Sequence, residues 1–247
     1  DDETLVIFTS DHGIGLHRAK QSIYSAGLQI PFLVAGPGVV SGRRLRTPIS
    51  HLDIAPTFTD LIGMPKLPSH SGKSLVPLFT ADSDTIPGRS TMLTACHRYY
   101  NARSVTDGKY YYVRNITKPA GTLANPALAL NTDQYQGGSP WFNRTYDATL
   151  GAAGSIGRDL LIQTVTGVGL PDEELFDLDQ DLWCVNNIID EPAHAATLVH
   201  LRQEMSEWRT TTEDYNTDSS ELVRRTNRCQ PPTGPPSGNP TDTFDGK

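Results

Sequence analysis

Short apolar runs separated by turn-forming residues dominate the first third of the chain. Residues 4–9 form a nearly continuous apolar run, and residues 30–35 form a second run that ends at a Gly-Pro-Gly breaker. Such runs are typical of parallel strands covered on both faces. The residues between them leave room for a helical piece near 20–26. The pattern therefore predicts a strand, a crossover and a second, parallel strand.

A helix is predicted over residues 54–62. Pro56 lies in its first turn and Gly63 follows its last turn, as is typical of helix ends. His51 and Asp53 precede this helix, and Asp53 is better explained as a helix-start carboxylate than as a catalyst. We place the end of this first, α/β domain near residue 80.

The next part of the chain has shorter runs in which apolar and polar residues alternate. The runs lie at residues 92–94, 102–105, 109–114 and 174–178. Asp107-Gly108, between two of them, is a strong hairpin signal. Residues 193–209 carry apolar side chains at helical spacing. We therefore predict an antiparallel sheet with a helix packed on it. The helical stripe consists of Ala196, Leu198, Val199, Leu201, Met205 and Trp208.

Two segments have weak periodicity. Residues 117–159 are rich in Gly, Asn, Pro and Thr, which predicts an irregular insertion with one short helix around 140–150. Residues 211–247 are rich in Pro, Gly, Thr, Ser and Asp, which predicts a flexible tail. The expected organisation is an α/β part over 1–80, a carboxyl-terminal subdomain over 81–210, and the tail.

Composition narrows the function classes. The 247 residues carry a net charge of −7, which argues against general binding to nucleic acid or to anionic membranes. No apolar run approaches the roughly 18 residues that a membrane-spanning helix needs. The cysteines Cys96, Cys184 and Cys229 lie far apart without Cys-x-x-Cys spacing, so neither a zinc ribbon nor a dense disulfide framework is indicated.

Asp11 and His12 are the most informative polar residues of the first domain. They follow the first predicted strand, and open α/β sheets place ligand sites at the carboxyl ends of their strands. An adjacent carboxylate and imidazole can both reach one divalent metal ion. The alternative is an ordinary polar turn in which Asp11 caps backbone amides, and the residue types alone do not decide between the two.

A cluster of cationic residues follows on the same connection. His17, Arg18 and Lys20 would suit a tetrahedral oxyanion, with lysine as a compact charge and arginine as a bidentate fork. The alternative is a solvated basic turn. His97, in the stretch 96–100, could overhang such a site or serve only in packing.

Other signals are weaker. Asn115-Ile116-Thr117 and Asn143-Arg144-Thr145 match the glycosylation pattern, a frequency near chance in a chain this rich in Asn and Thr. The sequence contains no Gly-rich phosphate loop, no Gly-x-Ser-x-Gly elbow and no His-Glu-x-x-His motif.

Taken in order, several segments resemble the carboxyl-terminal half of a sulfatase, a member of the alkaline phosphatase superfamily. The resemblance covers about residues 3–210, and its insertion and ending look most like the heparan N-sulfatase (sulfamidase) branch. The segments are residues 4–13 with the Asp-His step, Lys20 ahead of Tyr24 and residues 27–31, residues 50–57, residues 72–75, residues 103–115, and residues 174–178 followed by Asn187.

The resemblance implies a fold, a reaction and a set of roles. The fold would be α/β: the back part of an alkaline-phosphatase-like mixed or parallel sheet sandwiched by helices, with a smaller antiparallel sheet-and-helix subdomain. The reaction would be hydrolysis of a sulfate ester or sulfamate on a sulfated carbohydrate. Asp11 and His12 would be metal ligands and Lys20 the catalytic residue. The substrate-binding residues would be Lys20, His17, Arg18 and His97.

The cation expected from the resemblance is Ca²⁺. Calcium prefers oxygen ligands, however, and His12 supplies nitrogen, so Mn²⁺ or Zn²⁺ stays an alternative.

The chain departs from the family in two places. Sulfatases attack sulfur with a formylglycine made within Cys/Ser-x-Pro-x-Arg, and none of the three cysteines has that context. Asp181-Leu182-Trp183-Cys184 stands where the family usually has Asp-Pro-x-Glu, which alters a turn. We therefore expect the isolated chain to lack turnover.

The chain enters a core strand at residue 4 without a lead-in, so we expect it to begin inside a longer protein, with the signal peptide not in this chain. The resemblance implies a periplasmic or extracellular enzyme, or a lysosomal one in a eukaryote. It leaves the oligomeric state open.

Two other functions remain open. One is a phosphodiesterase or phosphonate monoester hydrolase of the same superfamily. The other is a non-catalytic remnant that binds sulfated glycan.

Overall fold

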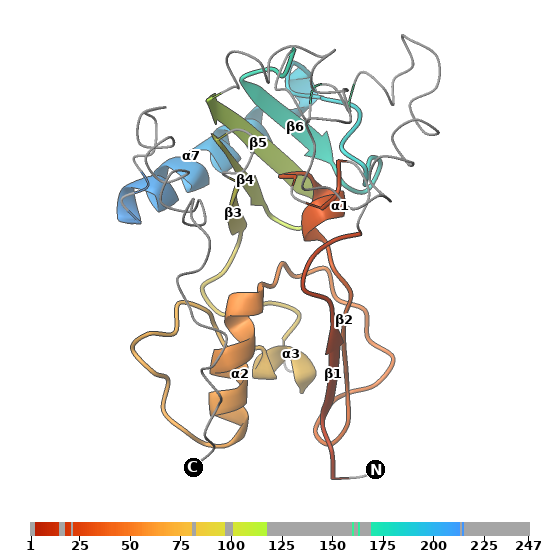
Figure 1. Cartoon of the computed structure of the whole chain (residues 1–247), viewed down its shortest axis with the longest axis vertical. Coiled ribbons are helices and arrows are strands. Elements are labelled where there is room, and N and C mark those ends of the chain that lie inside the picture. The colour runs from red at the N-terminus through yellow and green to blue at the C-terminus, as the bar shows by residue number, and fades with distance from the viewer. Residues whose placement is uncertain are drawn as a thin grey trace, which may run out of the picture.

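The computed structural model describes most of the chain in several ranges. They are residues 3–14, 18–20, 22–80, 83–96, 101–117 and 169–212, with the single residues 160, 163 and 214. A two-stranded sheet with small helices occupies one end of the molecule, and a four-stranded sheet with one long helix occupies the other (Figure 1). The segment around the short helix α1 (Ser25–Leu28) lies between these two parts.

The first two strands, β1 (Val6–Thr9) and β2 (Phe32–Ala35), pair antiparallel. The prediction of a parallel pair joined by a crossover is therefore wrong. The connection folds straight back on itself, with the amide of Gly13 donating to the carbonyl of Gly27 at 3.1 Å, so the chain returns antiparallel directly after β1. A continuous apolar run does not encode strand direction.

The prediction that both faces of these strands are covered is also wrong for the described residues. Burial alternates along each strand, and Phe8 and Leu33, which face each other across the pair, are 60% and 58% exposed. The inner face packs Phe32 and Val34 on a small core. The buried members of that core are Leu75, Leu78, Phe79 and Ile86.

Two further helices complete this end of the molecule. A 3₁₀ turn, η1 (His51–Asp53), leads into α2 (Ile54–Leu61), and α3 (Val76–Phe79) follows. The predicted helix is confirmed, with Pro56 in its first turns and Gly63 beyond its end at a φ of +70°.

The second sheet is the predicted antiparallel one. It has the order β3 (Met92–Cys96), β4 (Asn101–Thr106), β5 (Tyr110–Thr117) and β6 (Glu173–Asp177), and all neighbours pair antiparallel. The hairpin at Asp107-Gly108 is confirmed. Asp107 Oδ1 accepts from the amides of Lys109 and Tyr110, and Gly108 has a φ of +97°.

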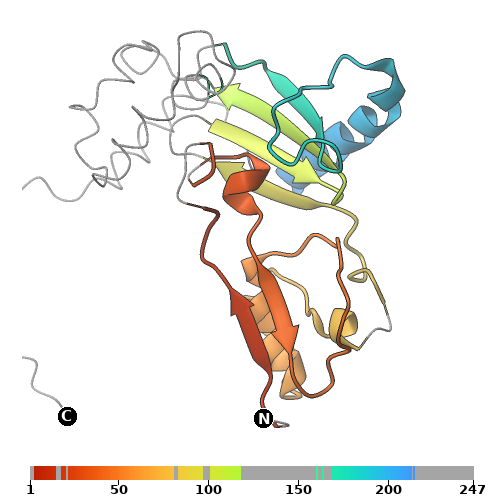
Figure 2. The same ribbon diagram turned by 90° about the vertical axis from the view of Figure 1, so that its right-hand side faces the viewer.

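The two faces of this sheet bury different partners (Figure 2). After the 3₁₀ turn η4 (Pro192–His194), the helix α7 (Ala195–Thr211) covers one face. There Leu198, Leu201 and Met205 pack with Val105, Tyr112, Leu175 and Ile188. Val199 of the predicted stripe is instead 62% exposed, because it lies just outside the i, i+3, i+7 set that faces the sheet.

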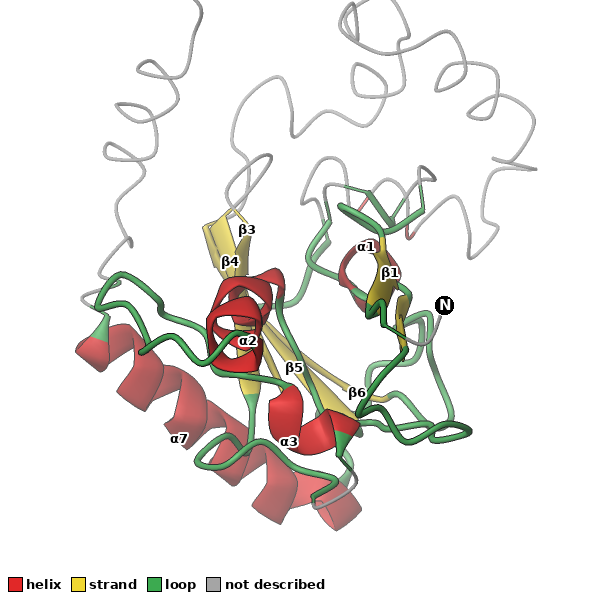
Figure 3. Ribbon diagram, turned by 90° about the horizontal axis from the view of Figure 1, so that it is seen from below, coloured by secondary structure: helices red, strands yellow, loops and turns green. Residues whose placement is uncertain are grey.

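The opposite face takes side chains from the first part of the chain. Ile23 and Tyr24, next to α1, pack on Tyr111, Val113 and Phe176. Tyr111 and Tyr112 therefore point to opposite faces, as the period of two requires. Seen from below, α1 and α7 lie on opposite sides of the sheet (Figure 3).

The remaining predictions about organisation are only partly within the described residues. The segment 118–159, with the helix expected around 140–150, lies outside them. Asp214 falls inside the range expected as a tail, yet it is bonded to the fully buried Arg103 of β4. Among the described residues, no helix combines the length and the apolar character needed to cross a membrane.

Candidate functional site

The described residues between β1 and the end of α1, here called the site loop, carry the candidate chemistry between the two sheets (Figure 1). They are residues 10–14, 18–20 and 22–28. The loop is compact: the amide of Lys20 donates to Ile14 at 3.1 Å, and that of Gly27 donates to Tyr24 at 2.9 Å. Two glycines permit this closeness. A Cβ on Gly13 would lie 2.2 Å from the carbonyl oxygen of Ala26, and one on Gly27 would lie 2.0 Å from that of Ala19.

Asp11 and His12 lie at the start of the site loop, shortly after the end of β1. His12 Nε2 lies 3.3 Å from Asp11 Oδ2, and the Asp11 side chain is 84% exposed. His12 Nδ1 lies 2.7 Å from the carbonyl oxygen of Gly13. Because a carbonyl only accepts, the imidazole donates from Nδ1 in this contact, and its Nε2 faces the Asp11 carboxylate.

A carboxylate oxygen and an imidazole nitrogen that lie this close together can both bind one cation. Asp11 and His12 thus fit two ligands of a divalent cation. Within the part of the chain that the structure describes, no group of three or more His, Cys, Asp or Glu residues is arranged to hold a metal ion.

His51, from a distant part of the sequence, contacts the start of the site loop. Its Nε2 lies 2.9 Å from the carbonyl oxygen of Ser10, and the imidazole is exposed. The bond ties η1 to the first residue of the site loop. Sequence reasoning treated His51 only as a residue before a helix, because a contact between residues 41 positions apart leaves no local signal.

The basic residues of the loop have different surroundings. The Lys20 side chain is exposed, which keeps its ammonium group accessible to an anion. The guanidinium of Arg18 points instead toward the carboxyl-terminal part, where it donates to the carbonyl of Cys184 and stacks 3.5 Å from the centre of the Tyr24 ring. His17 and His97 lie outside the described residues.

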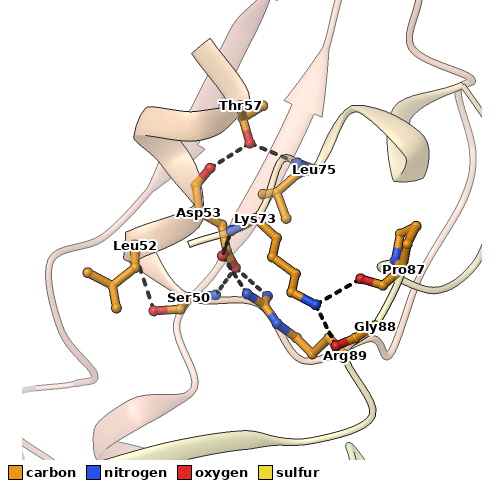
Figure 4. A network of polar contacts seen from close by, with 9 residues as sticks. All are labelled: Ser50, Leu52, Asp53, Thr57, Lys73, Leu75, Pro87, Gly88 and Arg89. Atoms are coloured by element: carbon orange, nitrogen blue, oxygen red, sulfur yellow. Dashed lines mark hydrogen bonds and ion pairs between the residues drawn. The ribbon is translucent and has the colours of Figure 1, made fainter. Parts of the chain in front are cut away.

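Asp53 is a buried carboxylate that is held by two backbone amides and one arginine (Figure 4). It is fully buried and accepts from the amides of Ser50 at 2.8 Å and Lys73 at 2.9 Å. Arg89 donates to both of its oxygens, at 2.6 and 2.7 Å. Burial acts to raise the pKa of Asp53, but these hydrogen bonds outweigh it and hold the pKa below the ordinary value.

An ionised carboxylate with this many donors is a poor acid or base. The hydroxyl oxygen of Ser50 accepts from the amide of Leu52 at 3.2 Å, and Ser50 and Asp53 together form a capping box. The interpretation of Asp53 as a helix-start carboxylate is confirmed.

The first glycosylation sequon is not a modification site. Asn115 is 5% exposed, and its Nδ2 donates to Pro171 and Glu174 at 2.9 and 3.0 Å. A glycan needs an exposed amide, so this match is a chance one. The second sequon lies outside the described residues.

The sequence of this chain is similar to those of several known proteins. A sequence model of the sulfatase family matches residues 1–64, which include Asp11, His12 and Lys20. The chain is 28% identical over 244 residues to the ulvan-active sulfatase of Formosa agariphila, covering 95% of this chain and 38% of that protein. It is 43% identical over 83 residues to arylsulfatase K of Danio rerio, covering 32% of this chain and 16% of that protein.

Two solved structures share the fold of this chain. A 2-O GAG sulfatase matches with a TM-score of 0.54 at 20% identity, over 85% of this chain and 37% of that one. A phosphonate monoester hydrolase from Silicibacter pomeroyi matches with a TM-score of 0.52 at 20% identity, over 88% of this chain and 37% of that one. The chain therefore spans well under half the length of each relative named here.

Proposed function

We propose that this chain, whose residues 1–64 match a sequence model of the sulfatase family, is part of a hydrolase that cleaves sulfate esters on sulfated carbohydrates. The observation that carries the proposal is the coincidence of the family match with the site loop. The matched residues hold the adjacent donors Asp11 and His12 and the exposed Lys20.

Each residue receives a role from its chemistry. Asp11 and His12 would hold a divalent cation, for which Ca²⁺ is our first candidate and Mn²⁺ or Zn²⁺ the alternatives. Such a cation supplies polarisation of a sulfuryl oxygen when it is bound. The ammonium of Lys20 pairs with sulfate oxygens and offsets the charge that develops on the leaving oxygen.

His17 and His97 remain proposals as further sulfate-binding residues. Arg18 was predicted as a fourth, but its guanidinium donates to the carbonyl of Cys184 and stacks on the Tyr24 ring, which favours a different role. Cleavage of a sulfamate and likeness to the heparan N-sulfatase branch stay predictions, which the identity of the substrate would test.

We propose that the nucleophile of the reaction is not among these 247 residues. Cys184 is buried, and burial raises the pKa of its thiol, so it is no candidate. The sequence has no Cys/Ser-x-Pro-x-Arg motif for a formylglycine. We therefore propose that the 247-residue chain alone does not turn over sulfate esters.

Sulfated carbohydrate is the proposed substrate class, and an extracellular or periplasmic location, or a lysosomal one in a eukaryote, is the proposed setting. Support comes from relatives whose names specify ulvan or an extracellular sulfatase, and from a neighbour solved with D-glucosamine-2-N,6-O-disulfate.

The competing function is that of a phosphonate monoester hydrolase, because such an enzyme shares the fold with a TM-score of 0.52. A paired assay of the full-length gene product with 4-nitrophenyl sulfate, bis(4-nitrophenyl) phosphate and a phenylphosphonate monoester separates the two. We expect the highest kcat/KM for the sulfate ester. A preference for either phosphorus substrate would reject the proposal, and glycan binding without any turnover would identify a non-catalytic remnant.

A further inference from the structure

Two residues with unusual backbone conformations contact each other across the molecule. Among the described residues, Arg18 and Cys184 alone have a positive φ without being glycine, at 58° and 54°. The guanidinium of Arg18 donates to the carbonyl of Cys184, although the two are 166 positions apart. A left-handed backbone at a non-glycine residue is unfavourable and persists where the surrounding structure holds it, often at functional sites.

Further bonds join the same two segments. Ser25 donates its hydroxyl to the carbonyl of Leu182, and Cys184 Sγ lies 3.5 Å from Ser25 Oγ. The turn that presents these carbonyls is itself held firmly, because Asp181 Oδ2 accepts from the amides of Val185 and Asn186, both at 2.7 Å. This is the turn in which the sequence departs from the family pattern.

Apolar burial supports the same contact. Tyr24 is fully buried, its ring meets Phe176 edge-on at 6.2 Å, and its hydroxyl donates to Glu174 at 3.1 Å. Tyr111 donates its hydroxyl to the carbonyl of Ile23. The carboxyl-terminal sheet is therefore the surface on which the site loop is seated.

We propose that Arg18 is a positioning residue that fixes the site loop on the carboxyl-terminal sheet, and that it does not bind sulfate. Arg18, Ser25, Leu182 and Cys184 form what we call the latch. Lys20 lies two residues beyond Arg18, and Ser22 donates to the Arg18 carbonyl at 2.8 Å, so the latch sets where the Lys20 ammonium stands relative to Asp11 and His12. The expected change in kcat rests on the proposed function, whereas the expected change in amide exchange rests on the geometry alone.

Kinetics distinguish positioning from sulfate binding. In the full-length gene product, Arg18→Ala is expected to lower kcat for a sulfate ester roughly 10- to 100-fold with little change in KM, because small displacements of a catalytic group are costly. Ser25 is 3% exposed and uncharged, so it is shielded from substrate, yet Ser25→Ala should lower kcat in the same way by a smaller factor. The double variant should lose less than the product of the two factors.

Two controls accompany these variants. Cys184→Ala keeps the carbonyl that accepts from Arg18 and removes only the contact of Sγ with Ser25, so it should lower kcat by no more than a few-fold. Arg44→Ala removes an exposed arginine of the same charge and should leave kcat unchanged.

Hydrogen exchange tests the latch without a measurement of enzyme activity. Amides of residues 18–28 should exchange at least about tenfold faster in Arg18→Ala than in wild type or Lys20→Ala. Unchanged exchange in Arg18→Ala, a rise in KM with kcat intact, or strictly multiplicative losses in the double variant would each overturn the proposal. Faster exchange in Arg18→Ala, together with a wild-type protein that hydrolyses no sulfate ester, would retain the latch and reject the proposed function.

Discussion

Arg89 donates two hydrogen bonds to the carboxylate of Asp53, at 2.6 and 2.7 Å, across 36 positions of sequence. The Asp53 side chain is fully buried and that of Arg89 is 11% exposed. The pair ties the start of α2 to the segment that leads into β3, and the amide of Lys73 reaches the same carboxylate (Figure 4). Asp53 therefore joins three segments that have no sequence proximity.

Removal of this carboxylate should be costly. Asp53→Ala leaves the guanidinium of Arg89 and two backbone amides without their acceptor, so we expect the free energy of unfolding to fall by about 3–5 kcal/mol in urea denaturation. Asp84→Ala is the control, because that carboxylate is 79% exposed and pairs with Arg43 at the surface. The control should cost less than about 1 kcal/mol. Equal losses in the two variants would contradict the account.

The same residue predicts a dependence of stability on pH. The pKa of Asp53 is lower in the folded protein than its ordinary value of 3.8, so the unfolded chain takes up this proton first as the pH falls. The stability that Asp53 contributes is complete above its unfolded pKa and is lost as the pH falls through its folded pKa. Between about pH 5 and pH 2, wild type should therefore lose more stability than Asp53→Asn. Parallel profiles of unfolding free energy against pH would refute this.

Close backbone contact in the site loop predicts an effect of a single methyl group. Gly27→Ala places a Cβ 2.0 Å from the carbonyl of Ala19, so it should destabilise the protein by about 3 kcal/mol. Gly38→Ala is the matched control: its Cβ meets nothing within 4 Å, and only its φ of +75° is unfavourable, for about 1 kcal/mol. Thermal unfolding of both variants measures the difference, and a larger loss for Gly38→Ala would contradict the geometry.

Cation binding should depend on Asp11 and His12, at the start of the site loop. We expect Ca²⁺ to bind the full-length gene product in calorimetry, and expect Asp11→Ala to weaken binding at least about tenfold because the variant removes a charged ligand. His12→Ala should act in the same direction. Asp60→Ala, which removes a carboxylate of α2 that accepts from Ser74, is the control and should leave binding unchanged. Wild-type affinity in Asp11→Ala would remove this residue from the cation site.

Local signals explain the parts of the fold that were predictable. The capping box of Ser50 and Asp53 precedes α2, Pro56 lies in its first turn and Gly63 follows its end, and the β4–β5 hairpin has Asp107-Gly108. These features act through the backbone of their own segment, so they are readable without tertiary context.

Contacts between distant residues explain what was missed. The direction of β2 depends on how Gly13 meets Gly27, and the place of Arg18 depends on a carbonyl at position 184. Neither contact leaves a periodic pattern in the sequence. The basic cluster was predicted from charge alone, and charge does not reveal that Arg18 and Lys20 point to different surroundings.

The central claim is that the site loop serves sulfate ester hydrolysis through Lys20. The most direct test is the release of inorganic sulfate from a sulfated oligosaccharide by the full-length gene product, compared with its Lys20→Ala and Arg44→Ala variants. We predict sulfate release by wild type and by Arg44→Ala, and a loss of about 100-fold or more in Lys20→Ala. Undiminished sulfate release by Lys20→Ala would contradict the account.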